Sequence, residues 1–156
     1  MGVQRSRRSE SPVYVAAVDA ISGPANVFLE VLGSATKTVR VLEVAVQPSA
    51  AADVTIERNS TAHTGGTSAS PALVKADTNS AAATAVVKTY TVAQTGGGTL
   101  VGVVGRVKIA ADGLFVWRPG DEDVGERGTL RGAAEAFTFA SDAAVTWRGH
   151  VVFAEE

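Results

Sequence analysis

The chain has 156 residues, a net charge of −2 and no cysteine, and 46% of its residues are hydrophobic. This length suits a single domain, and the absence of cysteine excludes disulfides, thiol nucleophiles and cysteine-ligated metals. The near balance of 14 basic and 16 acidic residues gives no overall field for nucleic acid, and no apolar run has the length of a membrane-spanning helix. We therefore expect a soluble protein with neither nucleic acid nor membrane as a partner.

Residues 1–12 are predicted to form a basic arm that is flexible or ordered by a partner. Three arginines, Arg5, Arg7 and Arg8, are accompanied by one acidic residue, Glu10. Polar residues and a proline follow the arginine pair where an export signal would carry an apolar helix, so we expect no export signal. The arginines are expected to dock onto an acidic partner.

Residues 13–156 are predicted to form one β-sandwich domain, because apolar and polar residues alternate along most of this stretch. Its first four strands are expected at residues 13–18, 26–32, 38–47 and 53–58. In the third strand the alternation changes phase near Leu42, which indicates either a β-bulge there or burial of both faces. In the fourth strand Val54 and Ile56 are expected to face the core.

A long loop at residues 59–83 follows, with almost nothing to bury. Of the 27 residues from 59 to 85, 19 are Ala, Gly, Ser or Thr, and Leu73 and Val74 are the large aliphatic residues among them. Long loops without structure of their own are uncommon inside compact domains. We interpret the loop as a surface excursion that is anchored by Leu73 and Val74 and ordered by neighbouring subunits.

Five further strands are predicted after this loop, at residues 84–92, 101–109, 114–117, 136–140 and 145–153. In the second of these, four residues of one parity are expected to face the core: Val101, Val103, Val107 and Ile109. With the first four, this makes an antiparallel sandwich of about eight to nine strands and no convincing helix. The fold class is therefore predicted as all-β and jelly-roll-like.

Outward-facing basic residues on two of these strands are candidates for partner docking. Arg106 and Lys108 alternate with valines on one strand, and Arg148 and His150 lie opposite the apolar face of the last strand. Such a face suits an acidic partner. The alternative is a solvated strand face whose charges discourage aggregation.

Residues that could carry chemistry are few. The two histidines, His63 and His150, are expected at the surface, and no G-x-S-x-G motif accompanies them. An acidic turn contains Asp121, Asp123 and Glu126, whose carboxylates are candidate calcium ligands, but the EF-hand spacing is not met. We expect no cofactor and no metal, and we expect that the chain is not an enzyme.

The order of segments in residues 26–156 resembles that of small structural proteins encoded by tailed bacteriophages. A strand ending VTIERNSTA leads to TGGTSASPALVKADTNSAAATAVVKTYT, then to a glycine-rich turn, and the chain closes with VTWRGHVVFAEE. The resemblance leaves out the arm, and residues 114–128 are not matched with it. It implies a jelly-roll-like sandwich in the virion, assembled in the host cytoplasm, and it carries no catalytic residues.

The function that this resemblance implies is that of a capsid decoration or head-fibre protein. Such a protein binds and reinforces the assembled shell as a symmetric oligomer, with a homotrimer among the expected forms. Its partners are the major capsid protein lattice or other virion proteins.

Two alternatives remain open at the level of sequence. One is a tail- or fibre-associated sandwich module that binds carbohydrate on the host surface, with Trp117 or Trp147 as the stacking platform. Because Trp147 shares the apolar face of its strand, Trp117 is the better candidate. The other alternative is a hydrolytic enzyme whose site the sequence does not reveal.

Overall fold

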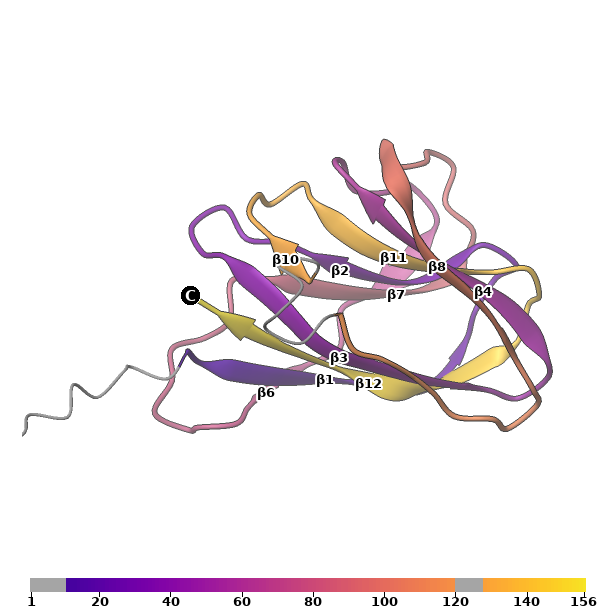
Figure 1. Ribbon diagram of the computed structural model, residues 1–156, viewed down its shortest axis with the longest axis horizontal. Coiled ribbons are helices and arrows are strands. Elements are labelled where there is room, and N and C mark those ends of the chain that lie inside the picture. Colours follow the sequence, from indigo (N-terminus) through magenta and orange to yellow (C-terminus); the bar gives the residue numbers. More distant parts are fainter. Residues whose placement is uncertain (1–10, 120–127) are drawn as a thin grey trace, which may run out of the picture.

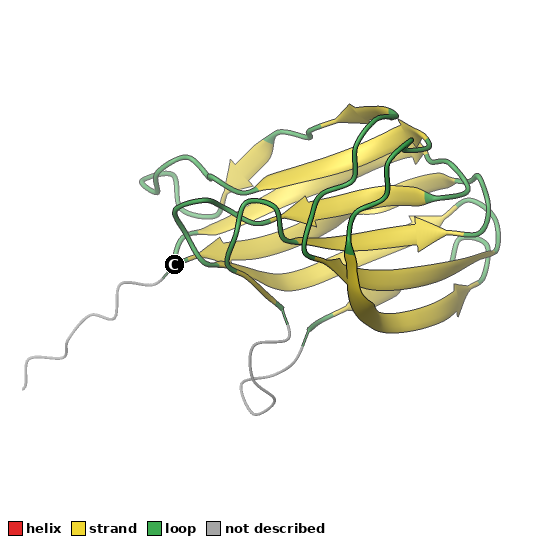
Figure 2. Cartoon of the chain, turned by 90° about the horizontal axis from the view of Figure 1, so that it is seen from above, coloured by secondary structure: helices red, strands yellow, loops and turns green. Residues whose placement is uncertain are grey.

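The computed structural model describes residues 11–119 and 128–156, and in these residues it contains strands and no helix. Twelve strands form two six-stranded antiparallel sheets that pack face to face as a sandwich (Figures 1 and 2). The predicted all-β sandwich is confirmed. The described residues include no helix long and apolar enough to cross a membrane.

The first sheet is built around three strands of ten residues each. It runs in the order β10 (Thr129–Leu130), β3 (Val39–Pro48), β12 (Thr146–Glu155), β1 (Val13–Ser22) and β6 (Leu73–Lys75), and β9 (Phe115–Trp117) also pairs with β3. Both edges of this sheet are therefore capped by strands of two or three residues.

The second sheet ends in one short strand and one long strand. Its order is β5 (Thr67–Ala69), β7 (Val86–Val92), β2 (Val27–Leu32), β11 (Ala136–Ser141), β4 (Ala52–Asn59) and β8 (Leu100–Ile109). The short β5 forms one edge, whereas the ten-residue β8 forms the other.

Eight of the strands form four nested antiparallel pairs. The first strand pairs with the last (β1 with β12), the second with the next to last (β2 with β11), and then β3 pairs with β9 and β4 with β8. The strands β5, β6 and β7 are inserted between β4 and β8, and β10 between β9 and β11. The sandwich is thus an antiparallel ribbon folded over on itself, with one large insertion.

The core consists of aromatic rings embedded in valine and alanine side chains. Trp147 stacks on Phe28 with ring centroids 3.9 Å apart and an interplanar angle of 2°, while Val54 and Ile56 are buried as expected. In β12 the predicted inward residues Trp147, Val151 and Phe153 are all fully buried. The period-two pattern therefore identified the core faces of these strands correctly.

The change of phase in β3 is a β-bulge. Val152 pairs with Glu43 and Phe153 with Val41, so the register shifts and Leu42 is left without a partner in this ladder. The extra residue reverses which parity faces the core. This agrees with the first of the two alternatives, and it puts the Leu42 side chain, 38% exposed, on the outside.

The prediction for the first half of β8 is wrong. Val101 and Val103 are exposed, whereas Ile109 is buried and Val107 is half-buried. Gly105 pairs with Ile56 but Val103 pairs with Glu57, so Val104 is an extra residue that transfers Val103 to the outer face. Bulges of this kind cannot be read from the alternation when both parities are apolar.

All nine predicted strands are present, and three further strands of two or three residues were not predicted: β5, β6 and β10. The strands β5 and β6 lie in the stretch that was predicted to be a loop. Their residues have no apolar alternation, so only their backbone pairing with longer strands makes them extended.

Candidate functional site

The long excursion between β4 and β7 is held by a buried carboxylate. Glu30 on β2 is fully buried. Its Oε1 accepts hydrogen bonds from the backbone N–H of His63 at 3.0 Å and contacts His63 Nδ1 at 3.2 Å, and its Oε2 accepts one from the Tyr90 hydroxyl at 2.7 Å. These contacts fasten the start of the excursion to the second sheet.

The prediction that His63 is a surface histidine is wrong, because its side chain is only 10% exposed. Burial by itself raises the pKa of Glu30, but the hydrogen bonds from the His63 side chain and backbone and from Tyr90 outweigh it and lower the pKa below its ordinary value. Burial and the hydrogen bond to Glu30 raise the pKa of Tyr90. Glu30 is therefore an ionised acceptor at neutral pH.

A second buried carboxylate holds the end of the excursion. The Oε1 atom of Glu155 accepts hydrogen bonds from the backbone N–H groups of Thr84 at 2.7 Å and Ala85 at 2.6 Å, and from the Thr84 hydroxyl at 3.2 Å. The Tyr14 hydroxyl adds a hydrogen bond to the Ala81 carbonyl at 2.9 Å. Burial, with a smaller contribution from the Glu155 charge, raises the pKa of Tyr14.

The predicted anchors Leu73 and Val74 lie in β6, which pairs with β1. Leu73 packs against the core, whereas the Val74 side chain is 64% exposed. Because β5 pairs with β7 and β6 with β1, the excursion reaches both sheets and lines one side of the sandwich. These contacts come from the chain's own sheets, while the notion of ordering by neighbouring subunits stays a prediction.

The predicted basic docking residues lie on two different sheets. Arg106 and Lys108 are exposed on β8, next to Thr55 and Asp53 of β4, and Arg148 is exposed on β12 in the first sheet. The alternation of charges along the strands therefore does not bring them together on one face. The other predicted residues, Arg5, Arg7, Arg8, Asp121, Asp123 and Glu126, lie outside the described residues.

A charged cluster occupies the outer surface of the first sheet. Glu43 on β3 accepts a hydrogen bond from Arg118 Nε at 2.8 Å and contacts His150 Nε2 at 2.7 Å. The hydrogen bonds from His150 and Arg118 lower the pKa of Glu43. Salt bridges at such exposed positions contribute little to stability, so the main effect of this cluster is to balance the negative charge of Glu43.

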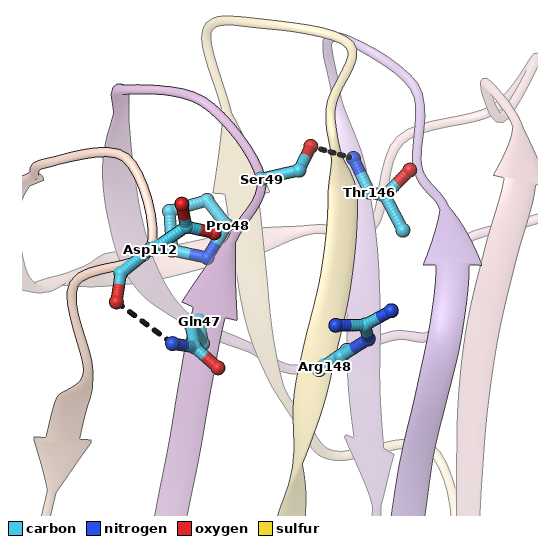
Figure 3. Close-up of a pocket in the computed structure, with 6 residues that line it drawn as sticks. All are labelled: Gln47, Pro48, Ser49, Asp112, Thr146 and Arg148. Carbon is cyan, nitrogen blue, oxygen red and sulfur yellow. Dashed lines mark hydrogen bonds between the residues drawn. The ribbon is translucent and has the colours of Figure 1, made fainter.

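A surface pocket of about 240 Å³ lies where β3, β12 and the turn after β8 meet (Figure 3). Gln47 Nε2 donates to the Asp112 carbonyl at 2.7 Å, and Ser49 Oγ accepts from the Thr146 N–H at 3.1 Å. Figure 3 shows Asp112 and Arg148 on opposite sides of it. The lining offers one carboxylate, one guanidinium and several hydroxyl and amide groups, which suits a small polar ligand.

Trp117, the candidate for an exposed stacking platform, is partly buried and packs against the core. Its ring lies edge-to-face with Phe137 at 5.2 Å and Phe139 at 5.6 Å. Among the described residues, no three His, Asp or Glu side chains gather in a way that would hold a metal ion.

Comparison with protein-family models, with curated proteins and with solved structures finds no match to this chain. The burial of Glu30 and Glu155 was not predicted, because a single glutamate in a strand is expected to face solvent. Glu30 does break the apolar run VFLEVL, which was the one available signal, because a carboxylate inside such a run needs hydrogen-bond partners.

Proposed function

We propose that this chain is a structural protein of a tailed-bacteriophage virion, a capsid decoration protein that binds the assembled shell as a symmetric oligomer. The observation that carries the proposal is the nested strand pairing β1–β12, β2–β11, β3–β9 and β4–β8. This pairing supports a jelly-roll fold, an eight-stranded architecture found in viral capsid and lectin domains. The segment order that resembles phage structural proteins supports the same conclusion.

The way the excursion is held also supports an assembly role. Two buried carboxylates and two short strands connect this stretch of small polar residues to both sheets. Its exposed residues therefore form a surface that is ordered before any partner binds. A surface that is already ordered loses less conformational entropy on binding. Many weak contacts of this kind, repeated over a symmetric shell, give high avidity without a deep site.

Binding to separated phage heads and tails tests the proposal. Purified chain is sedimented with undecorated heads and with tails of the phage that encodes it, and saturable binding to heads is expected. Deletion of residues 1–12, with its three arginines, is expected to weaken binding more at low than at moderate salt, because charge attraction is screened by salt. Absence of binding to heads would contradict the proposal.

The alternative is a tail- or fibre-associated module that contacts carbohydrate on the host surface. The polar pocket beside Arg148 favours it, since sugar hydroxyls need convergent donors and acceptors. In the sedimentation experiment this alternative predicts binding to tails. In a separate assay with host-surface glycans, it predicts that Arg148→Ala loses glycan binding.

A further inference from the structure

The first half of β8 is an exposed apolar edge. Leu100, Val101, Val103 and Val104 are 53%, 62%, 44% and 44% exposed, respectively. In the described part of the chain β8 pairs with β4 alone, so its other edge has no partner strand. Figure 1 shows the start of β8 standing at the rim of the molecule beside the end of β4.

The other sheet edges of the described chain are capped differently. They end in β5, β6, β9 and β10, which have two or three residues each, whereas β8 has ten. Natural proteins protect long edges with charges or proline. In β8 the charges Arg106 and Lys108 lie in the second half only, and the first half has none.

The backbone of this segment is also available for pairing with another strand. Two register shifts against β4 leave Val101 and Val104 without a pairing partner there. As an edge strand, β8 also presents a row of unpaired N–H and C=O groups along its free side. An occupant of this edge must therefore supply both apolar side chains and backbone hydrogen-bonding groups, which is what a β-strand does.

We propose that the occupant is the same segment of a second copy, so that two β8 strands pair antiparallel about a two-fold axis at Gly102. In that register Val101 faces Val103 of the other copy and Leu100 faces its Val104, so each exposed aliphatic meets another. Arg106 and Lys108 lie beyond the paired segment, on the side of the glycine-rich turn that precedes β8 in the other copy, so no like charges are opposed. An axis at Val107 would instead set Arg106 against Lys108, which is unfavourable.

Gly102 suits the axial position. A Cβ atom added there would meet no atom of its own chain within 4 Å, so the space beside it is open. Two glycines facing each other let the backbones approach closely. Such a contact has the isologous form of a two-fold dimer, which closes on itself and does not extend into fibres.

This pairing rests on the assembly role proposed above, but its test uses the purified full chain without phage particles, so the two can fail separately. Sedimentation of the wild type between about 5 and 500 μM is expected to show reversible dimers, a range suited to a small interface. Val103→Lys is expected to weaken dimerisation at least about ten-fold, because it puts a charge on the paired edge. Leu114→Lys, at an aliphatic residue that is 67% exposed outside β8, should dimerise like the wild type.

Cysteine substitution locates the axis, because the natural chain has no cysteine. Residues opposed across an antiparallel pair have Cα atoms about 4.5 to 5.5 Å apart, within the span of a disulfide. Gly102→Cys is therefore expected to form interchain disulfides faster than Leu114→Cys. A wild type that stays monomeric over the whole range, or equal cross-linking of the two variants, would overturn the inference.

Discussion

At the scale of single residues, this fold depends on a few positions in the strands where the backbone conformation is unusual. Gly149 lies in the middle of β12 with φ of +152°, and a Cβ atom there would lie 1.8 Å from the Ala45 carbonyl oxygen. Ala20, at a register shift of β1, has φ of 48°. Local irregularities therefore shape the backbone of β12 and β1, two of the three long strands of the first sheet.

The substitution Gly149→Ala is expected to lower the free energy of unfolding by at least about 2 kcal/mol. The added methyl group must displace the backbone of β3, and overpacking of this kind costs about 1 to 3 kcal/mol before any φ strain is added. Chemical denaturation measures the change. The control is Gly97→Ala, where a Cβ would meet nothing within 4 Å, and an equal effect of the two substitutions would contradict this explanation.

At the scale of elements, the excursion from 60 to 85 depends on hydrogen bonds to side chains of distant strands. Its short strands have little apolar surface, so β5 and β6 cannot persist without the sheets that they extend. Glu30 and Glu155 supply acceptors for backbone N–H groups that would otherwise be buried without partners. Ordering of the excursion is therefore coupled to the core.

The substitution Glu155→Ala is expected to release the end of the excursion. It removes the acceptor for two backbone N–H groups, and hydrogen bonds to a charged group contribute about 1.5 to 3 kcal/mol. Faster amide hydrogen exchange at Thr84 and Ala85 measures the release. Glu156→Ala is the matched control, because its carboxylate makes an exposed salt bridge with Arg40, and surface pairs of this kind contribute little. Unchanged exchange in Glu155→Ala would show that other contacts hold the segment.

At the scale of the whole molecule, the insertion lines one side of the sandwich, and on the opposite side the long edge of β8 has no partner strand within residues 11–119 and 128–156. This asymmetry gives each face a separate role in the proposed assembly: a firm surface for the shell and an apolar edge for a second copy. Stability as a function of pH is also a property of the whole molecule, because it sums over every carboxylate whose pKa changes on folding.

Stability is expected to fall as the pH drops below about 4.3, the ordinary pKa of a glutamate. The lowered pKa of Glu30 in the folded state means that its contribution is complete above that pH and is lost as the pH falls through the folded value. In Glu30→Gln the dependence of the unfolding free energy on pH should be flatter in this range. Glu57→Gln, which removes a carboxylate on β4 outside this hydrogen-bonded network, is the control, and identical slopes in all three proteins would exclude Glu30 as the source.

The sequence by itself determined the all-β class, nine of the twelve strands described, and the inward faces of β4 and β12, because alternating burial leaves a period-two pattern in the residues of a strand. It indicated the irregularity at Leu42 for the same reason. It did not determine that Val101 and Val103 are exposed, that His63 is buried, or that Arg106 and Arg148 lie on different sheets. Those depend on bulges, on which strands are neighbours and on partners distant in the chain, and only the tertiary structure decides them, since no local pattern records a contact between residues tens of positions apart.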